Sequence, residues 1–191
     1  MSDDEENNNY LPSMAEDIQS LIEKELYEGR ALFFNDDVDD DSIKDLIMKI
    51  TWLDFHNDFP ITVYFNTDGG SVYNFLELYD FTHSIKSKVN IHITGRAFSA
   101  GALILACCAT GERTSGRNAS FMIHNLSTWV GGSFAEVEDD YKECVRLTEN
   151  MERLLAKHTK LTRKKVKALS SRNTYFDALT AREWGFIDRI R

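Results

Sequence analysis

Residues 61–79 read ITVYFNTDGGSVYNFLELY and combine three kinds of local pattern in one stretch. Residues 61–65 are β-branched or aromatic, which is typical of a buried strand. A glycine-containing turn follows, and apolar residues then recur at helical spacing at Val72, Phe75, Leu76 and Tyr79. The stretch predicts a strand–turn–helix unit. Glycines at such a turn let the backbone approach a ligand closely, although a plain tight turn explains them as well when they are taken alone.

The same alternation of strands and helices continues along the chain. Further strands are predicted at 30–34, 89–93, 119–124 and 186–190. Further helices are predicted at 14–22, 43–53, 97–108, 133–158 and 162–169, and 180–183 is predicted as a capping box with Gly185 as the stop. Strands that are regularly separated by helices favour βαβ crossovers, so we expect an α/β fold with a mainly parallel sheet.

Length and composition are those of one globular domain. The chain has 191 residues, of which 42% are hydrophobic and 28% are charged. We expect a disordered acidic tail over residues 1–13 and a single domain over 14–191. The three cysteines are Cys107, Cys108 and Cys144, and their odd number and spacing indicate buried reduced thiols rather than disulfides or a zinc site.

Charge is spread unevenly along the chain. Residues 1–58 carry 17 acidic and 4 basic side chains, and residues 59–191 carry 14 acidic and 18 basic ones. No basic stripe is interleaved with aromatic residues, so we expect no nucleic-acid partner. The longest apolar run, 100–109, is too short to span a bilayer, and the N-terminal sequence MSDDEENNN is unlike an export signal. We therefore expect a cytoplasmic protein with no membrane partner.

Two loops have the outline of ligand-binding motifs but lack the residues that bind. Residues 35–41 alternate aspartates like a calcium loop, yet Ser42 and Met48 stand where that loop needs glycine and glutamate. Residues 111–116 have the glycine spacing of a phosphate loop, but the lysine and the serine or threonine that should follow are missing. We expect neither a metal nor a cofactor.

A serine and a histidine follow two of the predicted strands. Ser99 lies in the segment Gly-Arg-Ala-Phe-Ser-Ala-Gly-Ala at the predicted start of a helix, where the helix N-terminus stabilises developing negative charge. This arrangement resembles a nucleophile elbow, although a helix-capping serine is the common alternative. His124 ends an apolar strand, a place where a histidine is usually structural. Because strand ends of a parallel sheet lie along one edge, the turn, Ser99 and His124 are expected to meet.

Several segments, in the same order, resemble the ClpP family, the proteolytic subunits of the Clp protease. The resemblance runs from about Arg30 to the C-terminus. Residues 66–70 resemble the family's Asn-Ser-Pro-Gly-Gly turn, and residues 95–102 resemble its nucleophile segment. Residues 122–124 match its Met-Ile-His, and residues 172–173 fall where the family has Arg-Asp.

The resemblance implies a ClpP/crotonase-like fold of repeated βαβ units with a protruding handle helix over 131–158. It also implies homo-oligomeric rings of seven subunits, stacked in pairs around a closed chamber that admits unfolded polypeptides. An AAA+ ATPase unfoldase is then a possible partner, although the acidic N-terminal stretch does not resemble the family's apolar axial segment.

The resemblance further implies a serine endopeptidase. Ser99 would be the nucleophile, His124 the general base and Asn173 the third member of the triad. The backbone N–H groups of Gly70 and Ala100 would form the oxyanion hole.

Three positions depart from the family's pattern, and one of them is Leu126, which stands where the family usually has proline. Asn173 stands where most of the family has aspartate, and its amide can orient the imidazole but cannot supply a negative charge. Asp177 is the alternative third member. Asp68 replaces the proline of the glycine turn, which predicts a less rigid turn.

Two other functions remain open. One is a catalytically weak or silent ClpP-like subunit that needs an active partner ring, because Asn173 lacks the charge. The other is a crotonase-like acyl-CoA enzyme, which would not need both Ser99 and His124. A Ser-Lys peptidase is disfavoured, since Arg96 is the cation near Ser99 in sequence and cannot act as a base.

Overall fold

The computed structural model describes residues 10–129 and 131–191. Its helices are α1 (Tyr10–Glu28), α2 (Asp40–His56), α3 (Val72–Ser84), α4 (Ala100–Cys108), α5 (Phe134–His158), α6 (Arg163–Ser170) and α7 (Ala178–Trp184). Its strands are β1 (Ala31–Phe34), β2 (Ile61–Thr67), β3 (Val89–Phe98), β4 (Arg113–Ser115), β5 (Ser120–Ile123), β6 (Thr174–Asp177) and β7 (Arg189–Ile190). Among the described helices, none combines the length and the hydropathy that a membrane span requires.

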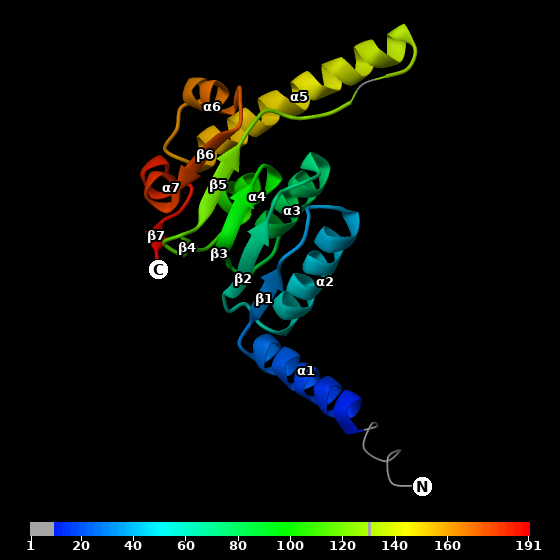
Figure 1. Ribbon diagram of the computed structural model, residues 1–191, viewed down its shortest axis with the longest axis vertical. Helices are drawn as coiled ribbons and strands as arrows, with labels where there is room; N and C mark the ends of the chain where they lie inside the picture. Colours follow the sequence, from blue (N-terminus) through cyan, green and yellow to red (C-terminus); the bar gives the residue numbers. More distant parts are fainter. Residues whose placement is uncertain (1–9, 130) are drawn as a thin grey trace, which may run out of the picture.

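The strands form one sheet that is mostly parallel, as the sequence predicts (Figure 1). The order is β1-β2-β3-β4-β7, and β5 pairs with the C-terminal part of β3 while β6 pairs with β5. Every pair is parallel except β5–β6. The ends of β2, β3 and β5 therefore lie close together, which brings the segments that follow these strands to one edge of the sheet.

Helix α4 is buried along its whole length. Each of its residues, AGALILACC, is excluded from solvent, and it contacts β3, α3 and α5. A short helix that is apolar on every side is stable only inside a core. Ser99 immediately precedes this helix, so the core determines where the serine lies.

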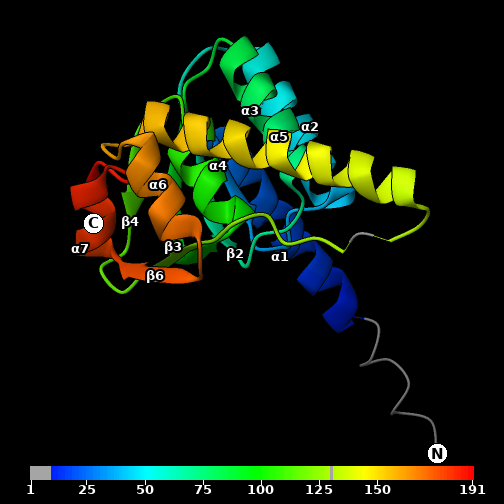
Figure 2. The ribbon, with the colours of Figure 1, turned by 90° about the horizontal axis from the view of Figure 1, so that it is seen from above.

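Helix α5 divides into a packed half and a projecting half. Leu147, Met151 and Leu155 of its C-terminal half are buried. In its N-terminal half, the exposed fractions of Phe134 and Tyr141 are 91% and 67%. Figures 1 and 2 show this half extending beyond the body of the molecule. The predicted handle helix is thus present, with an apolar surface that its own chain does not cover.

The structure corrects several predicted boundaries. Helix α1 begins at Tyr10, inside the segment 1–13 that the sequence marks as a tail, and residues 1–9 of that tail lie outside the described residues. Strand β3 extends to Phe98, so α4 begins at Ala100 rather than at residue 97. The extension forms because the C-terminal part of β3 pairs with β5. The short strands β4 and β6 were not predicted.

Candidate active site

Ser99 has a backbone conformation that side chains rarely adopt. Its φ is 53° and its ψ is −121°, and positive φ strains a residue other than glycine. Its N–H donates a hydrogen bond to Met122 O at 2.8 Å, which ties the residue to the end of β5. Ser99 occupies the N-cap position of α4, but its side chain does not cap the helix. The capping alternative is therefore wrong, and the hydroxyl is free to point elsewhere.

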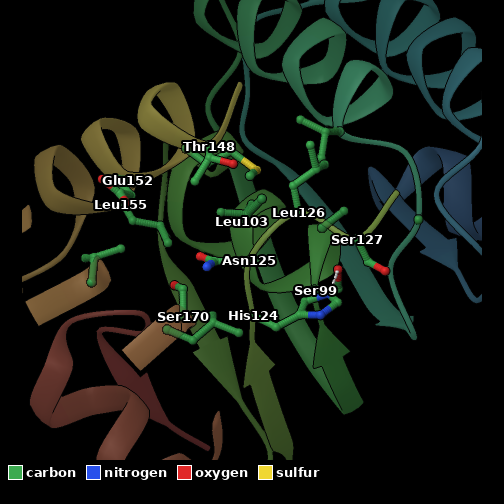
Figure 3. Close-up of a pocket in the computed structure, with 16 residues that line it drawn as sticks. Ser99, Leu103, His124, Asn125, Leu126, Ser127, Thr148, Glu152, Leu155 and Ser170 are labelled. Carbon is green, nitrogen blue, oxygen red and sulfur yellow. Dashed lines mark hydrogen bonds between the residues drawn. The ribbon is translucent and has the colours of Figure 1, made fainter. Parts of the chain in front are cut away.

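The hydroxyl of Ser99 points at the imidazole of His124. Ser99 Oγ lies 2.7 Å from His124 Nε2, and the contact is visible in Figure 3. Both side chains are only partly buried, so a ligand can reach them. If Nε2 accepts this hydrogen bond, Nδ1 carries the ring proton, and Nε2 can take the hydroxyl proton when Oγ attacks.

The glycine turn lies directly against Ser99. Gly69 and Gly70 have φ values of 101° and 148°. A Cβ on Gly69 would lie 2.6 Å from Phe98 O and 2.7 Å from Ser99 Cβ, so no larger residue fits without displacing Ser99. The turn is anchored on its other side by Val38, whose N–H donates to Gly69 O at 2.8 Å. Glycine is required at position 69 because the backbone of the turn approaches Ser99 closely. This approach places the turn beside the Ser99 hydroxyl.

Among the described residues, two backbone N–H groups that line the cavity of Ser99 have no hydrogen-bond acceptor. Ala100 is the first residue of α4, so its N–H has no partner within the helix. In the described part of the chain, neither Ala100 nor Gly70 donates one of the backbone hydrogen bonds that lie outside helices and strands. Both residues line the same cavity as Ser99 and His124. This arrangement suits an oxyanion, which needs preorganised donors.

The cavity beside Ser99 and His124 has a volume of about 160 Å³. Its lining is mostly apolar and includes Leu103, Leu126, Met151, Leu155 and Val166. Figure 3 shows Ser99 and His124 at one end, with residues of α5 on the far side. An apolar cavity next to a hydroxyl–imidazole pair can accept an apolar side chain of a substrate. The sequence did not predict this lining, whose α5 members include the buried residues Met151 and Leu155.

Comparison with known proteins agrees with this geometry. A family model described as Clp protease matches residues 14–191. The chain belongs to the Clp protease family. It is similar to the ATP-dependent Clp protease proteolytic subunit 2 of Corynebacterium jeikeium (strain K411), with 32% identity over 167 residues, which are 86% of this chain and 80% of that protein. The resemblance drawn from the sequence is thereby confirmed, and so is the fold class.

Asn173 stands at the position predicted for the third member of the triad and departs there from the Clp protease pattern. The antiparallel register of β5 and β6 pairs Ile123 with Thr174, so the next position along each strand sets His124 opposite Asn173. Asn173 is nevertheless exposed, and within 10–129 and 131–191 no hydrogen bond joins it to His124. Its backbone is well placed for a third member, but that role stays a prediction.

Asp177 has a different role. Its Oδ1 accepts a hydrogen bond from Thr180 N at 2.8 Å and caps α7, so the helix starts at Ala178 and not at the predicted capping box of 180–183. Gly185, with φ of 81°, ends the helix as predicted. Asp177 pairs with Ser120 at the far end of β5 from His124. It is therefore a helix cap and not a substitute for Asn173.

We expect Asp177→Ala to lower Tm by roughly 2–4 °C and to leave kcat unchanged, because a cap is lost while His124 is untouched. Asp177→Asn keeps an acceptor and serves as the matched control.

Hydrogen bonds from Thr180 N–H and the Thr180 side chain lower the pKa of Asp177. The cap therefore stabilises the fold above the ordinary aspartate pKa of about 3.9 and is lost as the pH falls through the lower folded-state value. Equal Tm values for the wild type and the alanine variant at pH 7 would contradict this role.

None of the three cysteines lines the cavity of Ser99. Cys107 and Cys108 are buried in α4, as predicted, and burial raises the pKa of Cys107 to about 12. A thiol with that pKa stays neutral and is a poor nucleophile. Cys144 of α5 is only partly buried, so the prediction of a buried thiol is wrong for this residue. Among the described residues, no cluster of three His, Cys, Asp or Glu side chains is placed to hold a metal ion.

Proposed function

We propose that this member of the Clp protease family is a serine endopeptidase that cleaves unfolded polypeptides. The observation that carries the proposal is the 2.7 Å contact between Ser99 Oγ and His124 Nε2. The hydroxyl belongs to a residue of strained backbone that does not cap its helix. A serine arranged in this way is typical of an activated nucleophile.

The chemistry follows from the positions of these groups. Ser99 Oγ attacks the carbonyl carbon of the scissile peptide, and its proton passes to His124 Nε2. The tetrahedral oxyanion accepts hydrogen bonds from the N–H groups of Gly70 and Ala100. The protonated imidazole then donates its proton to the leaving amine, and an acyl-enzyme forms. Water hydrolyses that ester, with His124 again acting as the base.

The same proposal includes assembly into rings of seven subunits, stacked in pairs. Its support is the projecting half of α5, whose exposed apolar residues need a covering surface, since large apolar patches are rare on monomers. The relative from Corynebacterium jeikeium is named as a subunit of an ATP-dependent protease. An AAA+ unfoldase is accordingly the partner that would deliver unfolded chains. Enclosure in a chamber would make an unselective site safe.

A fluorophosphonate probe tests the proposal directly. The purified protein is treated with the probe, digested and analysed by mass spectrometry, while native mass spectrometry reports the oligomeric state of the same sample. We expect a single adduct on Ser99 and cleavage of an unfolded substrate. An assembled ring that takes up no probe, unless a second subunit type is added, would instead identify the silent partner subunit.

Asn173→Asp should raise kcat for peptide cleavage by about tenfold, because a carboxylate opposite His124 stabilises the charged imidazole. The reverse change costs trypsin-like enzymes about 10⁴ in kcat, and we expect a smaller gain here because no hydrogen bond joins Asn173 to His124 in the described part of the chain. Steady-state kinetics on a short peptide measure the effect, and Asn173→Ala is the control. Unchanged or slower turnover of an intact assembly would count against Asn173 as the third member.

A further inference from the structure

Strand β3 contains a bulge beside the glycine turn. Its register with β2 shifts between Phe65 and Thr67, which leaves extra residues of β3 without a direct partner. Bulges near functional sites change the direction of a side chain. Arg96 lies on this bulge, between the regular part of β3 and Ser99.

The guanidinium group of Arg96 donates hydrogen bonds to both carboxylate oxygens of Asp68. Arg96 Nε lies 2.5 Å from Oδ1 and Arg96 Nη2 lies 2.7 Å from Oδ2. Such a fork fixes the orientation of both groups. The side chains are 45% and 57% exposed, so the pair contributes little to global stability. Its effect is therefore local.

The backbone of the bulge is fixed from behind by Asn66. Its Oδ1 accepts a hydrogen bond from Arg96 N at 2.9 Å, and its Nδ2 donates to Asn35 Oδ1. A Cβ on Gly95 would lie 2.6 Å from Asn66 Oδ1, so the bulge fits closely against this amide. Arg96 is thus a firm attachment point for whatever its guanidinium binds.

Asp68 immediately precedes the two glycines. Consecutive glycines have the greatest backbone freedom of any residues, yet an oxyanion donor has to be held within about 0.5 Å of its working position. Val38 anchors the turn after Asp68, since its N–H donates to Gly69 O and its carbonyl accepts from Ser71 N at 2.7 Å. The ion pair with Arg96 anchors the turn before the glycines.

We propose that the Asp68–Arg96 ion pair is a positioning device that keeps the N–H of Gly70 directed at the oxyanion. This inference rests on the proposed peptidase function. It makes Asp68 and Arg96 positioning residues, since neither has to touch the reacting atoms. The pair then replaces the rigidity that a proline ring gives to the corresponding turn in the family's pattern, because proline fixes φ.

Both members of the Asp68–Arg96 ion pair are charged at the pH of a peptidase assay. The hydrogen bond from Arg96 and its positive charge lower the pKa of Asp68. The carboxylate therefore stays charged above the ordinary aspartate pKa of about 3.9 and is protonated only as the pH falls through its lower folded-state value. A loss of activity between pH 6 and pH 8 would belong to other groups.

The test is a double-mutant cycle on steady-state kinetics. Asp68→Ala and Arg96→Ala should each lower kcat about tenfold with KM changed less than about twofold, because a misplaced donor weakens the transition state and not the binding of the peptide. The double variant should be no slower than either single variant, because the same ion pair is lost in the two single variants and in the double variant. Labelling of Ser99 by the fluorophosphonate should slow in parallel.

Asp45→Asn is the matched control, because it breaks an ion pair of similar length, Lys49–Asp45 at 2.6 Å, on α2 and away from the site. It should leave both constants unchanged. Asp68→Asn is nearly isosteric and exposed, so it keeps the test valid if an alanine variant folds poorly. Unchanged kcat in these Asp68 variants, a rise in KM alone, or additive losses would overturn the inference. An inactive wild type would instead overturn the peptidase proposal itself.

Discussion

Replacing Ser99 with alanine is expected to lower kcat for peptide cleavage by about 10⁶-fold, the loss seen when a triad nucleophile is removed. The nucleophile disappears, and His124 is left without its 2.7 Å partner. Stability should change little, because alanine keeps the Cβ that strains a backbone of positive φ and loses only the hydroxyl group. Turnover of a fluorogenic peptide measures the loss of kcat, and mass spectrometry of the probe adduct measures the loss of labelling at position 99.

Ser84→Ala is the control for this change. Ser84 is exposed at the end of α3, where its hydroxyl donates to Phe81 O at 2.7 Å, and it lies outside the cavity lining. It should keep full activity and full labelling. If Ser99→Ala still reacted with the phosphonate, another nucleophile would be responsible and the triad would be wrong.

The second large effect is expected from Gly69→Ala. The added methyl group would lie 2.6 Å from Phe98 O, 2.7 Å from Ser99 Cβ and 3.0 Å from Ala100 N, and φ of 101° is unfavourable for alanine. Relief of these contacts has to move either the turn, which carries Gly70, or Ser99 and the adjoining Ala100. Either movement displaces one donor of the proposed oxyanion hole. We expect kcat to fall by about 10²–10³, which is the cost of losing one donor.

Gly116→Ala is the matched control for Gly69→Ala. A Cβ at Gly116 would meet nothing closer than Ile93 O at 3.9 Å, which is an ordinary contact. Circular dichroism and native mass spectrometry should show both variants folded and equally assembled. A Gly69→Ala variant that is folded, assembled and fully active would show that the turn does not contribute a donor.

The sequence predicted the elements whose pattern is complete within a short stretch. Strand β2 and helix α3 were found because alternation and helical spacing are visible in residues 61–79. The start of α5 was predicted to within one residue from the helical spacing of its apolar residues, and the structure adds a capping box formed by Ser133 and Glu136. These patterns depend on residues close together in the sequence and not on contacts between distant segments.

Other features depend on contacts between distant segments and were missed or misplaced. The end of β3 could not be located, because Ala97 and Phe98 are held extended by pairing with residues far away in the chain, on β5 and, for Ala97, also on β2. Part of the apolar wall of the cavity comes from Met151 and Leu155 of α5 and Val166 of α6, which are far from Ser99 in sequence. The fork between Arg96 and Asp68 arises from a bulge, and no periodicity marks that bulge.

The strained backbone of Ser99 has a practical consequence for quantifying this protein. A φ of 53° persists only while its surroundings impose it, above all the bond from Ser99 N–H to Met122 O. If that bond opened, the core and the mass of the molecule would be unchanged, but the Ser99 hydroxyl would no longer be directed at His124. Titration with the irreversible probe counts only the molecules whose hydroxyl is directed at His124, so rates should be normalised by that titration rather than by protein concentration.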